Sequence, residues 1–181
     1  LGYDRTPSPL TKELEAEGIA VQYDDSLDTV KALDVANTIV VRTPAVPEDF
    51  AVYVWLREQG FQILKRAEVL GLVTRSERAL CVAGTHGKTT TSTLTSHLFM
   101  DSGEGCSAFL GGISKNYNTN LLISQNDVIV AEADEFDRSF LQLYPEIAVI
   151  TSMDADHLDI YGDAAHVTEA FKAFASQISG T

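Results

Sequence analysis

The segment Leu80 to Leu94, LCVAGTHGKTTTSTL, has the residue types of a phosphate-binding loop. Its apolar start, Leu80 to Ala83, is typical of a buried strand, and a glycine turn and a Thr/Ser-rich helix start follow it. The free amide groups and the dipole of such a helix create positive potential at its N-terminus. Gly84 and Gly87 allow the backbone to close tightly around a phosphate. We therefore interpret this segment as a nucleoside triphosphate site.

Two side chains just after the turn could act on the phosphates. Lys88 supplies a mobile positive charge for the outer phosphates, and the Thr89 hydroxyl can ligate Mg²⁺. His86 could face the substrate or simply fill the turn, and both interpretations stay open. The candidate nucleotide-binding residues are Gly84, Thr85, His86, Gly87, Lys88, Thr89 and Thr90.

The loop departs from the strict Walker A pattern. That pattern has a glycine five residues before Gly87, where this chain has Val82. The alternative interpretation is a glycine-rich turn that only caps a helix. The Thr/Ser run at 89–96 weighs against that alternative, because Ser and Thr are mediocre helix formers and suit a position with polar partners nearby.

Acidic residues follow two further apolar runs that are expected to be strands. Residues 132–137 are EADEFD and residues 152–159 are SMDADHLD. Because ligands bind beyond the carboxyl ends of strands in open α/β sheets, we expect both clusters at the same edge as the glycine loop. Glu132, first after its strand, is the best-placed oxygen ligand for Mg²⁺. His157 is a less usual magnesium ligand and would require a second cation site shared with Glu132. The alternative is that these acids are solvated loop charges.

Helices and strands alternate along the chain, which predicts the α/β class with layers built on parallel sheets. We expect helices over 9–17, 47–60, 65–72 and 89–101, and strands over 19–23, 38–41, 61–64, 80–83, 128–131 and 147–151. We expect a glycine-rich loop around Gly111 and Gly112. The last helix should bury an apolar stripe made of Val167, Ala170, Phe171, Phe174 and Ile178.

Composition excludes several classes of function. The 181 residues include 13 Lys and Arg against 26 Asp and Glu, a net charge of −13 that argues against nucleic acid and anionic membrane as partners. Cys81 and Cys106 show no metal or disulfide spacing, which fits a reducing cytoplasm. We find no signal peptide and no apolar run long enough for membrane insertion. The chain begins Leu1-Gly2-Tyr3-Asp4 without Met, and we expect it to be a fragment.

The motifs GTHGKTT (84–90), EADEFDRSF (132–140) and DADHLDIYG (154–162), in this order, closely resemble the Mur ligases of peptidoglycan synthesis. The segments VVRTPAVPEDF (40–50) and GGISKNYNTN (111–120) are similar to the branch of that family that joins L-alanine to UDP-N-acetylmuramate. The resemblance covers essentially the whole chain. It implies a Rossmann-like UDP-sugar domain, a P-loop-type central ATPase domain and a C-terminal amino-acid domain.

On this resemblance the chain holds parts of the first two domains, both incomplete and each a three-layer unit on a parallel sheet. We expect the UDP-sugar domain over 1–78 and the ATPase domain over 79–181, with the charged segment 74–78 as the joint. A homodimer stays open as an assembly.

The resemblance also implies the chemistry. ATP would phosphorylate the muramoyl carboxylate to an acyl phosphate, and the L-alanine amine would attack it to give an amide, ADP and phosphate. Lys88 would neutralise charge on the transferring group, Thr89 and Glu132 would hold Mg²⁺, and Glu132 with His157 would hold a second cation.

Contact with the sugar nucleotide and the choice of amine are less specific predictions. His86, Asn116, Thr119 and Asn120 are weaker candidates for contact with UDP-N-acetylmuramate, and Ser152 stands where the family often has Asn. A sibling ligase that attaches a recycled tripeptide to the same nucleotide sugar is one alternative. A P-loop kinase or a regulatory nucleotide-binding module, from another functional class, is a second.

Overall fold

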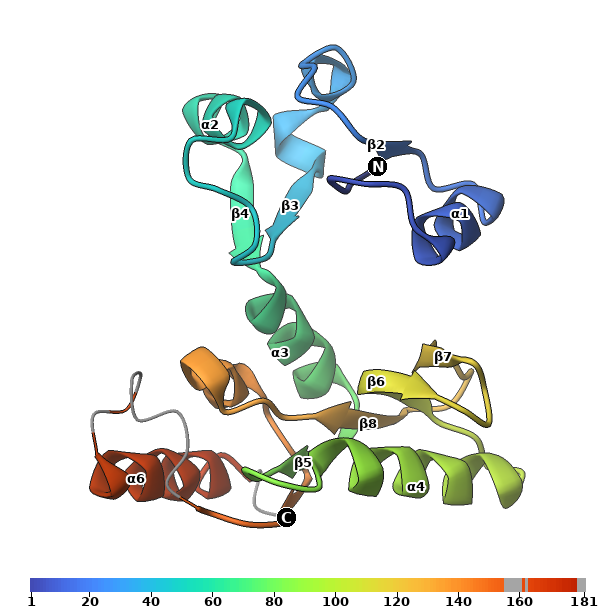
Figure 1. Ribbon diagram of the computed structural model, residues 1–181, viewed down its shortest axis with the longest axis vertical. Helices are drawn as coiled ribbons and strands as arrows, with labels where there is room; N and C mark the ends of the chain where they lie inside the picture. Colours follow the sequence, from blue (N-terminus) through green and yellow to red (C-terminus); the bar gives the residue numbers. More distant parts are fainter. Residues whose placement is uncertain (155–160, 162, 179–181) are drawn as a thin grey trace. The chain divides into compact units, whose positions relative to one another are not determined.

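The computed structural model describes residues 1–154, 161 and 163–178 and divides into two compact units, Leu1–Lys65 and Arg66–Thr181 (Figure 1). The division therefore lies between Lys65 and Arg66, ahead of the segment 74–78 where we expected a joint. Helix α3 (Arg66–Ser76) includes the first part of that segment. Thr74 is 1% exposed, and its hydroxyl accepts a hydrogen bond from the Tyr144 amide, so this segment is packed into the second unit.

The first unit contains two pairs of parallel strands, β1 with β2 and β3 with β4. Its elements are β1 (Gly2–Tyr3), α1 (Pro9–Ala16), β2 (Val21–Gln22), the 3₁₀ helices η1 (Val30–Ala32) and η2 (Val35–Asn37), β3 (Ile39–Arg42), α2 (Ala51–Glu58) and β4 (Gln62–Lys65). Each parallel pair is joined by a helix, as parallel pairing requires. The expected strands and helices are present, although α2 begins after Phe50 rather than at Pro47.

The second unit is built on one five-stranded sheet in the order β7-β6-β8-β5-β9. Its elements after α3 are β5 (Arg78–Ala83), α4 (Lys88–Asp101), β6 (Ser107–Ser114), β7 (Thr119–Leu122), β8 (Val128–Glu132), the 3₁₀ helix η3 (Phe136–Gln142), β9 (Ile147–Ile150) and α6 (Ala164–Ala175). All neighbouring strands are parallel except β6 and β7, which form an antiparallel hairpin at one edge.

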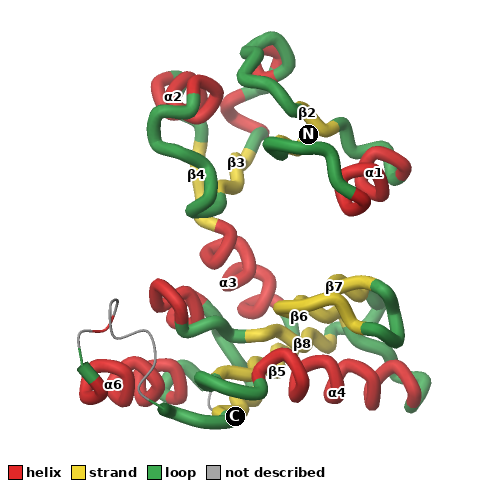
Figure 2. The backbone as a smooth tube through the Cα atoms, viewed as in Figure 1, coloured by secondary structure: helices red, strands yellow, loops and turns green. Residues whose placement is uncertain are grey.

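Helices cover both faces of this sheet, so the second unit has three layers (Figures 1 and 2). On one face Cys81 and Ala131 pack with Phe140 of η3 and with Phe171 and Phe174 of α6. A second cluster, formed by Cys106, Ala108, Leu110, Leu122 and Val130, packs with Phe99 of α4. Because side chains alternate across a strand, consecutive residues of β5 and β8 supply opposite layers, which explains their continuous apolar sequences. The expected α/β class with parallel sheets is confirmed.

Two local predictions were wrong. Gly111 and Gly112 lie inside strand β6, not in a loop, at an irregularity between the residues that pair with β7, Phe109 and Ser114. The last apolar stripe is buried at Val167, Ala170, Phe171 and Phe174, but Ile178 is 41% exposed because α6 ends at Ala175.

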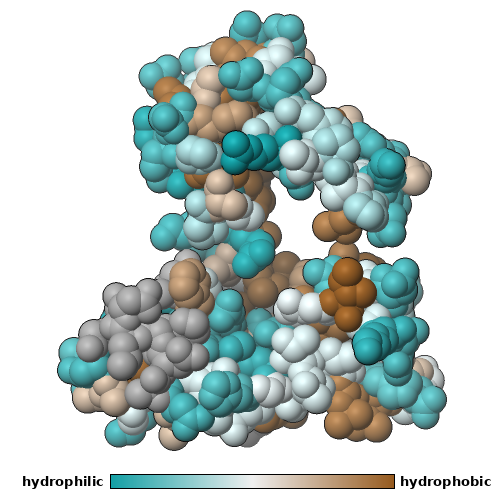
Figure 3. Space-filling model, in the orientation of Figure 1, coloured by the Kyte–Doolittle hydropathy of each residue, from teal (hydrophilic) through white to brown (hydrophobic). Residues whose placement is uncertain are grey.

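Hydrophilic atoms dominate the face of the molecule shown in Figure 3, and hydrophobic atoms form separate patches on it. Among the described residues, none of the helices combines the length and the apolar character needed to cross a lipid bilayer.

Candidate functional site

The loop of residues 84–87 connects the end of β5 to the start of α4 and has two glycines in left-handed conformations. Gly84 has φ +128° and Gly87 has φ +82°, values that L side chains rarely adopt. A side chain at position 84 would also collide with the Thr151 hydroxyl and the backbone of Ser152. Both glycines are therefore required by the backbone path of this loop.

The first half of the loop is fastened to the residues that follow β9. The Thr85 amide donates to the Ser152 carbonyl oxygen (3.2 Å), and the His86 amide donates to Ser152 Oγ (2.9 Å). The Thr85 and Ser152 hydroxyl oxygens are 2.8 Å apart, and Thr85 Oγ1 also accepts from the Asp154 amide (3.1 Å). Sequence reasoning placed Thr85 in the loop but missed this role of Ser152, which only long-range contact reveals.

The second half of the loop presents the free N-terminus of α4. The first helical hydrogen bond runs from the Thr91 amide to the Gly87 carbonyl oxygen (2.9 Å). The amides of Lys88, Thr89 and Thr90 precede that bond and so have no acceptor inside the helix. Donors of this kind, together with the helix dipole, suit a phosphate group.

Two oxygen ligands meet beside this helix start. Thr89 Oγ1 donates to Glu132 Oε1 (3.0 Å), and the Gly111 amide donates to Glu132 Oε2 (2.9 Å). A hydroxyl and a carboxylate are the hard donors that Mg²⁺ prefers, and this ion usually completes its coordination with water and substrate phosphates. The residues therefore fit magnesium, and no group of three or more His, Cys, Asp or Glu side chains within the described residues offers another metal site.

Lys88 points back across the loop and is held at two places. Its Nζ donates to the Gly84 carbonyl oxygen (2.8 Å) and lies 2.8 Å from Glu135 Oε2. Glu135 belongs to the EADE segment, but its sequence neighbours gave no sign that it, rather than another acid, would contact the lysine.

Other residues predicted for the site are less closely connected. His86 Nε2 lies 3.5 Å from Asp154 Oδ2, and both side chains are exposed. Asn116, Thr119 and Asn120 lie on the β6–β7 hairpin, where Thr119 Oγ1 accepts from the Leu121 amide (3.2 Å). Within the described part of the chain, no hydrogen bond joins these three residues to the loop. The predicted ligand His157 lies outside the described residues.

Cys81 lies in β5 directly before the loop and is fully buried. Burial raises the pKa of its thiol from 9.0 to about 12. The thiol therefore stays neutral at ordinary pH, as a core residue should, and Cys106 is also buried and reduced.

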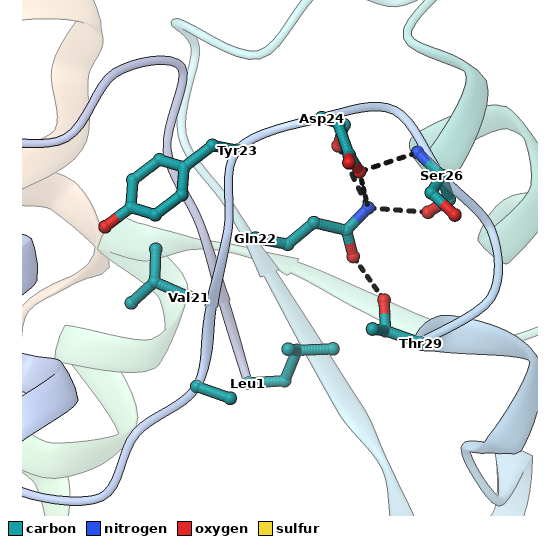
Figure 4. Close-up of a pocket in the computed structure, with 8 residues that line it drawn as sticks. Leu1, Val21, Gln22, Tyr23, Asp24, Ser26 and Thr29 are labelled. Atoms are coloured by element: carbon teal, nitrogen blue, oxygen red, sulfur yellow. Dashed lines mark hydrogen bonds between the residues drawn. The ribbon is translucent and has the colours of Figure 1, made fainter.

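A separate pocket of about 460 Å³ lies in the first unit, along β2 and the residues that follow it (Figure 4). Its lining includes Leu1, Tyr23 and Thr29. Gln22 also lines the pocket, and its side-chain amide donates hydrogen bonds to the carbonyl oxygens of Asp24 and Ser26 (2.9 and 2.6 Å). This pocket shares no residue with the loop, whose contacts all belong to the second unit.

The site described above coincides with a known domain. Residues 82–181 match the Mur ligase middle domain. The chain belongs to the Mur ligase family. In this Mur ligase chain the match begins in β5, two residues before the first glycine of the loop, and includes Glu132.

Named relatives of this Mur ligase chain cover its whole length. A UDP-N-acetylmuramate–L-alanine ligase from Flavobacterium psychrophilum is 53% identical over 178 residues, which are 98% of this chain and 40% of that protein. The ligase of the same name from Phocaeicola vulgatus is 55% identical over 98% of this chain and 39% of its own length. The chain thus spans about 40% of the length of these curated relatives.

Solved structures of Mur ligases are similar to this chain across both units. UDP-N-acetylmuramate:L-alanyl-gamma-D-glutamyl-meso-diaminopimelate ligase from Neisseria meningitides matches with a TM-score of 0.85 and 25% identity, over 99% of this chain and 60% of that one. UDP-N-acetylmuramate-alanine ligase from Thermotoga maritima matches with a TM-score of 0.81 and 27% identity, over 97% of this chain and 41% of that one.

Proposed function

We propose that this chain is part of a cytoplasmic, ATP-dependent ligase that joins L-alanine to the carboxylate of UDP-N-acetylmuramate in peptidoglycan synthesis. The proposal depends most on one observation, the meeting of the 84–87 loop, Lys88 and the Thr89–Glu132 oxygen pair. The names of the relatives, which are 53% and 55% identical, support the choice of substrates.

The residues at the start of α4 would bind the phosphates. The amides of Lys88, Thr89 and Thr90 donate to phosphate oxygens, and the Lys88 ammonium neutralises charge on the transferring group. Gly84, Thr85, His86 and Gly87 form the wall of the site, and the contacts to Ser152 keep that wall in place before the nucleotide arrives. Because this wall is already ordered, nucleotide binding does not have to order it, and the affinity for the nucleotide is higher.

Activation of the carboxylate needs both ATP and metal. ATP supplies the phosphoryl group that converts the muramoyl carboxylate into an acyl phosphate, which the alanine amine can attack. Thr89 and Glu132 would hold Mg²⁺, and Gly111 orients the Glu132 carboxylate through its amide. His157 would hold a second cation together with Glu132, as the resemblance to the family implies.

The first unit would belong to the UDP-sugar domain that the resemblance to the family implies, and the second unit holds four further candidate contacts for the sugar nucleotide. His86, Asn116, Thr119 and Asn120 are the candidate contacts. The exposed positions of His86, Asn116 and Asn120 support this assignment, because their side chains are accessible to a substrate.

The second candidate function is the attachment of a tripeptide to the same nucleotide sugar. The similarity to the Neisseria meningitides ligase, whose name includes such a peptide, favours keeping this candidate. The two reactions share the carboxylate and the nucleotide, so only the amine separates them.

A phosphate-release assay on the full-length protein tests the proposal. ATP and UDP-N-acetylmuramate are supplied with alanine, glycine, serine or the tripeptide in parallel. We expect release only when the sugar nucleotide and an amine are both present, and fastest release with alanine. Fastest release with the tripeptide would assign the sibling activity. A phosphorylated acceptor as the final product would identify a kinase and contradict both assignments.

A further inference from the structure

The contact between Lys88 and Glu135 is a buried ion pair. Lys88 Nζ lies 2.9 Å from Oε1 and 2.8 Å from Oε2 of Glu135, and the exposed fractions of the two side chains are 14% and 2%. By comparison, the Arg78–Glu146 ion pair of the same unit has side chains exposed by 59% and 36%. The fold therefore largely buries the loop lysine against a carboxylate.

The backbone around Glu135 is fixed independently of Lys88. Glu135 directly precedes η3, and its carbonyl oxygen accepts hydrogen bonds from the Arg138 amide (3.0 Å) and the Tyr161 hydroxyl (2.6 Å). The Tyr161 ring is 4% exposed and lies 5.3 Å from the Arg138 guanidinium carbon. The amide of Phe140 donates to the Asp134 carbonyl oxygen (2.9 Å). These contacts fix the position from which the carboxylate reaches the lysine.

A carboxylate beside a phosphate site requires an explanation, because it repels the ligand of that site. Charges that are shielded from water interact strongly, since the effective dielectric constant near a protein group is far below that of water. Glu135 therefore reduces the attraction of the loop for phosphate, while its contact holds the flexible lysine chain close to the loop. Neutralising the carboxylate should therefore raise the affinity for the nucleotide and lower the turnover rate.

We propose that Glu135 is a positioning residue that holds the Lys88 ammonium at the Gly84 carbonyl and offsets its charge, so that the nucleotide product is released readily. This inference rests on the nucleotide-binding role proposed above. It also changes the expectation for Lys88→Ala, because that variant leaves the Glu135 carboxylate buried without its lysine. Lys88→Ala should weaken nucleotide binding and lower the unfolding temperature, and part of both losses comes from Glu135.

The test uses the full-length protein and two measurements besides activity. The dissociation constant of Mg·ADP is measured by calorimetry and the unfolding temperature without nucleotide, for Glu135→Gln, Lys88→Ala and the double variant. Glu146→Gln is the matched control, since it makes the same chemical change in an exposed ion pair of the same unit.

We expect Glu135→Gln to bind Mg·ADP about tenfold more tightly and to turn over more slowly. A merely structural role would weaken both. We expect the double variant to bind Mg·ADP more tightly than Lys88→Ala and to unfold at a higher temperature, because the two residues are coupled. Glu146→Gln should match the wild type.

Weaker or unchanged Mg·ADP binding by Glu135→Gln, or losses that simply add in the double variant, would overturn the inference. Should Glu135→Gln not fold, Glu135→Asp decides, because it keeps the charge but retracts it from Lys88. Slower turnover of Glu135→Asp with unchanged affinity for Mg·ADP supports the positioning role, and unchanged turnover of this variant refutes it. A wild-type protein that binds no Mg·ADP would refute the proposed function itself, whereas coupling in the unfolding temperatures is measured either way.

Discussion

Gly111 shows how a residue without a side chain can position the Glu132 carboxylate, which we propose as a magnesium ligand. Its amide donates to Glu132 Oε2, and a Cβ at this position would collide with the Glu132 carboxylate. At the neighbouring Gly112 an added Cβ would lie 3.4 Å from the Thr89 methyl group, a distance that a small shift relieves. Glycine inside a strand often marks such a close approach.

This difference predicts that Gly111→Ala disturbs magnesium binding and Gly112→Ala disturbs it much less. The added methyl at 111 must push the Glu132 carboxylate away from Thr89, which separates the two oxygen ligands. We expect the magnesium concentration for half-maximal activity of the full-length protein to rise about tenfold. This is the lower end of the loss in metal affinity that usually follows when a contact that orients a metal ligand is displaced. Equal magnesium titrations for the two variants would contradict the assignment of Glu132.

At the scale of elements, the loop depends on the segment after β9, which lies more than sixty residues away in sequence. Ser152 accepts the His86 amide through Oγ and the Thr85 amide through its carbonyl oxygen. Strands β5 and β9 are neighbours in the sheet, so their carboxyl ends bring these residues together. The shape of the loop therefore depends on the pairing of β5 with β9 as well as on the two loop glycines.

We therefore expect Ser152→Ala to weaken Mg·ADP binding about fivefold, because the His86 amide and the Thr85 hydroxyl lose a partner worth about 1 kcal/mol. The carbonyl contact of residue 152 remains, so the unfolding temperature should change little. Ser102→Ala is the control, since that hydroxyl is exposed at the far end of α4, where it donates to the Phe99 carbonyl oxygen and accepts from the Glu104 amide. Calorimetric titration of both variants checks this, and equal affinities would show that the loop keeps its shape without Ser152.

The elements that sequence reasoning located well are those whose local signals agree with their long-range contacts. The apolar run before Gly84 and the helix start at Lys88 are such cases, and both were predicted to within two residues. The β6 strand was missed because two glycines disfavour a strand locally, and the pairs that define it, with β8 at 107–109 and with β7 on both sides of the glycines, are long-range contacts. Among site residues, Lys88, Thr89 and Glu132 follow from their order along the chain. The partners Glu135 and Ser152 do not, because tertiary packing selects them.

At the scale of the whole molecule, each unit buries its own core, and the site depends on the core of the second. In the first unit Val30, Val52, Leu56 and Phe61 pack together, whereas in the second β5 lies inside the sheet between β8 and β9. Cys81 of β5 is fully buried, in contact with the layer formed by η3 and α6. Its ionisation therefore reports on the folding of the whole second unit.

Burial raises the pKa of the Cys81 thiol from 9.0 to about 12, and this shift has a definite consequence for stability. Between pH 9 and pH 12 the unfolded chain loses this proton while the folded chain keeps it, so the folded state loses relative stability as pH rises. Below pH 9 both states are neutral and the shift has no effect. At pH 10 the loss amounts to about 1.4 kcal/mol.

Denaturant unfolding at pH 7 and pH 10 isolates this contribution when the wild type is compared with Cys81→Ala. The variant loses packing contacts at both pH values, so its stability is lower throughout. Its decrease between pH 7 and pH 10 should nevertheless be smaller than that of the wild type by about 1.4 kcal/mol, because residue 81 no longer ionises on unfolding. Equal decreases would mean that the thiol reaches solvent in the folded protein, which would contradict the buried position of β5 directly before the 84–87 loop.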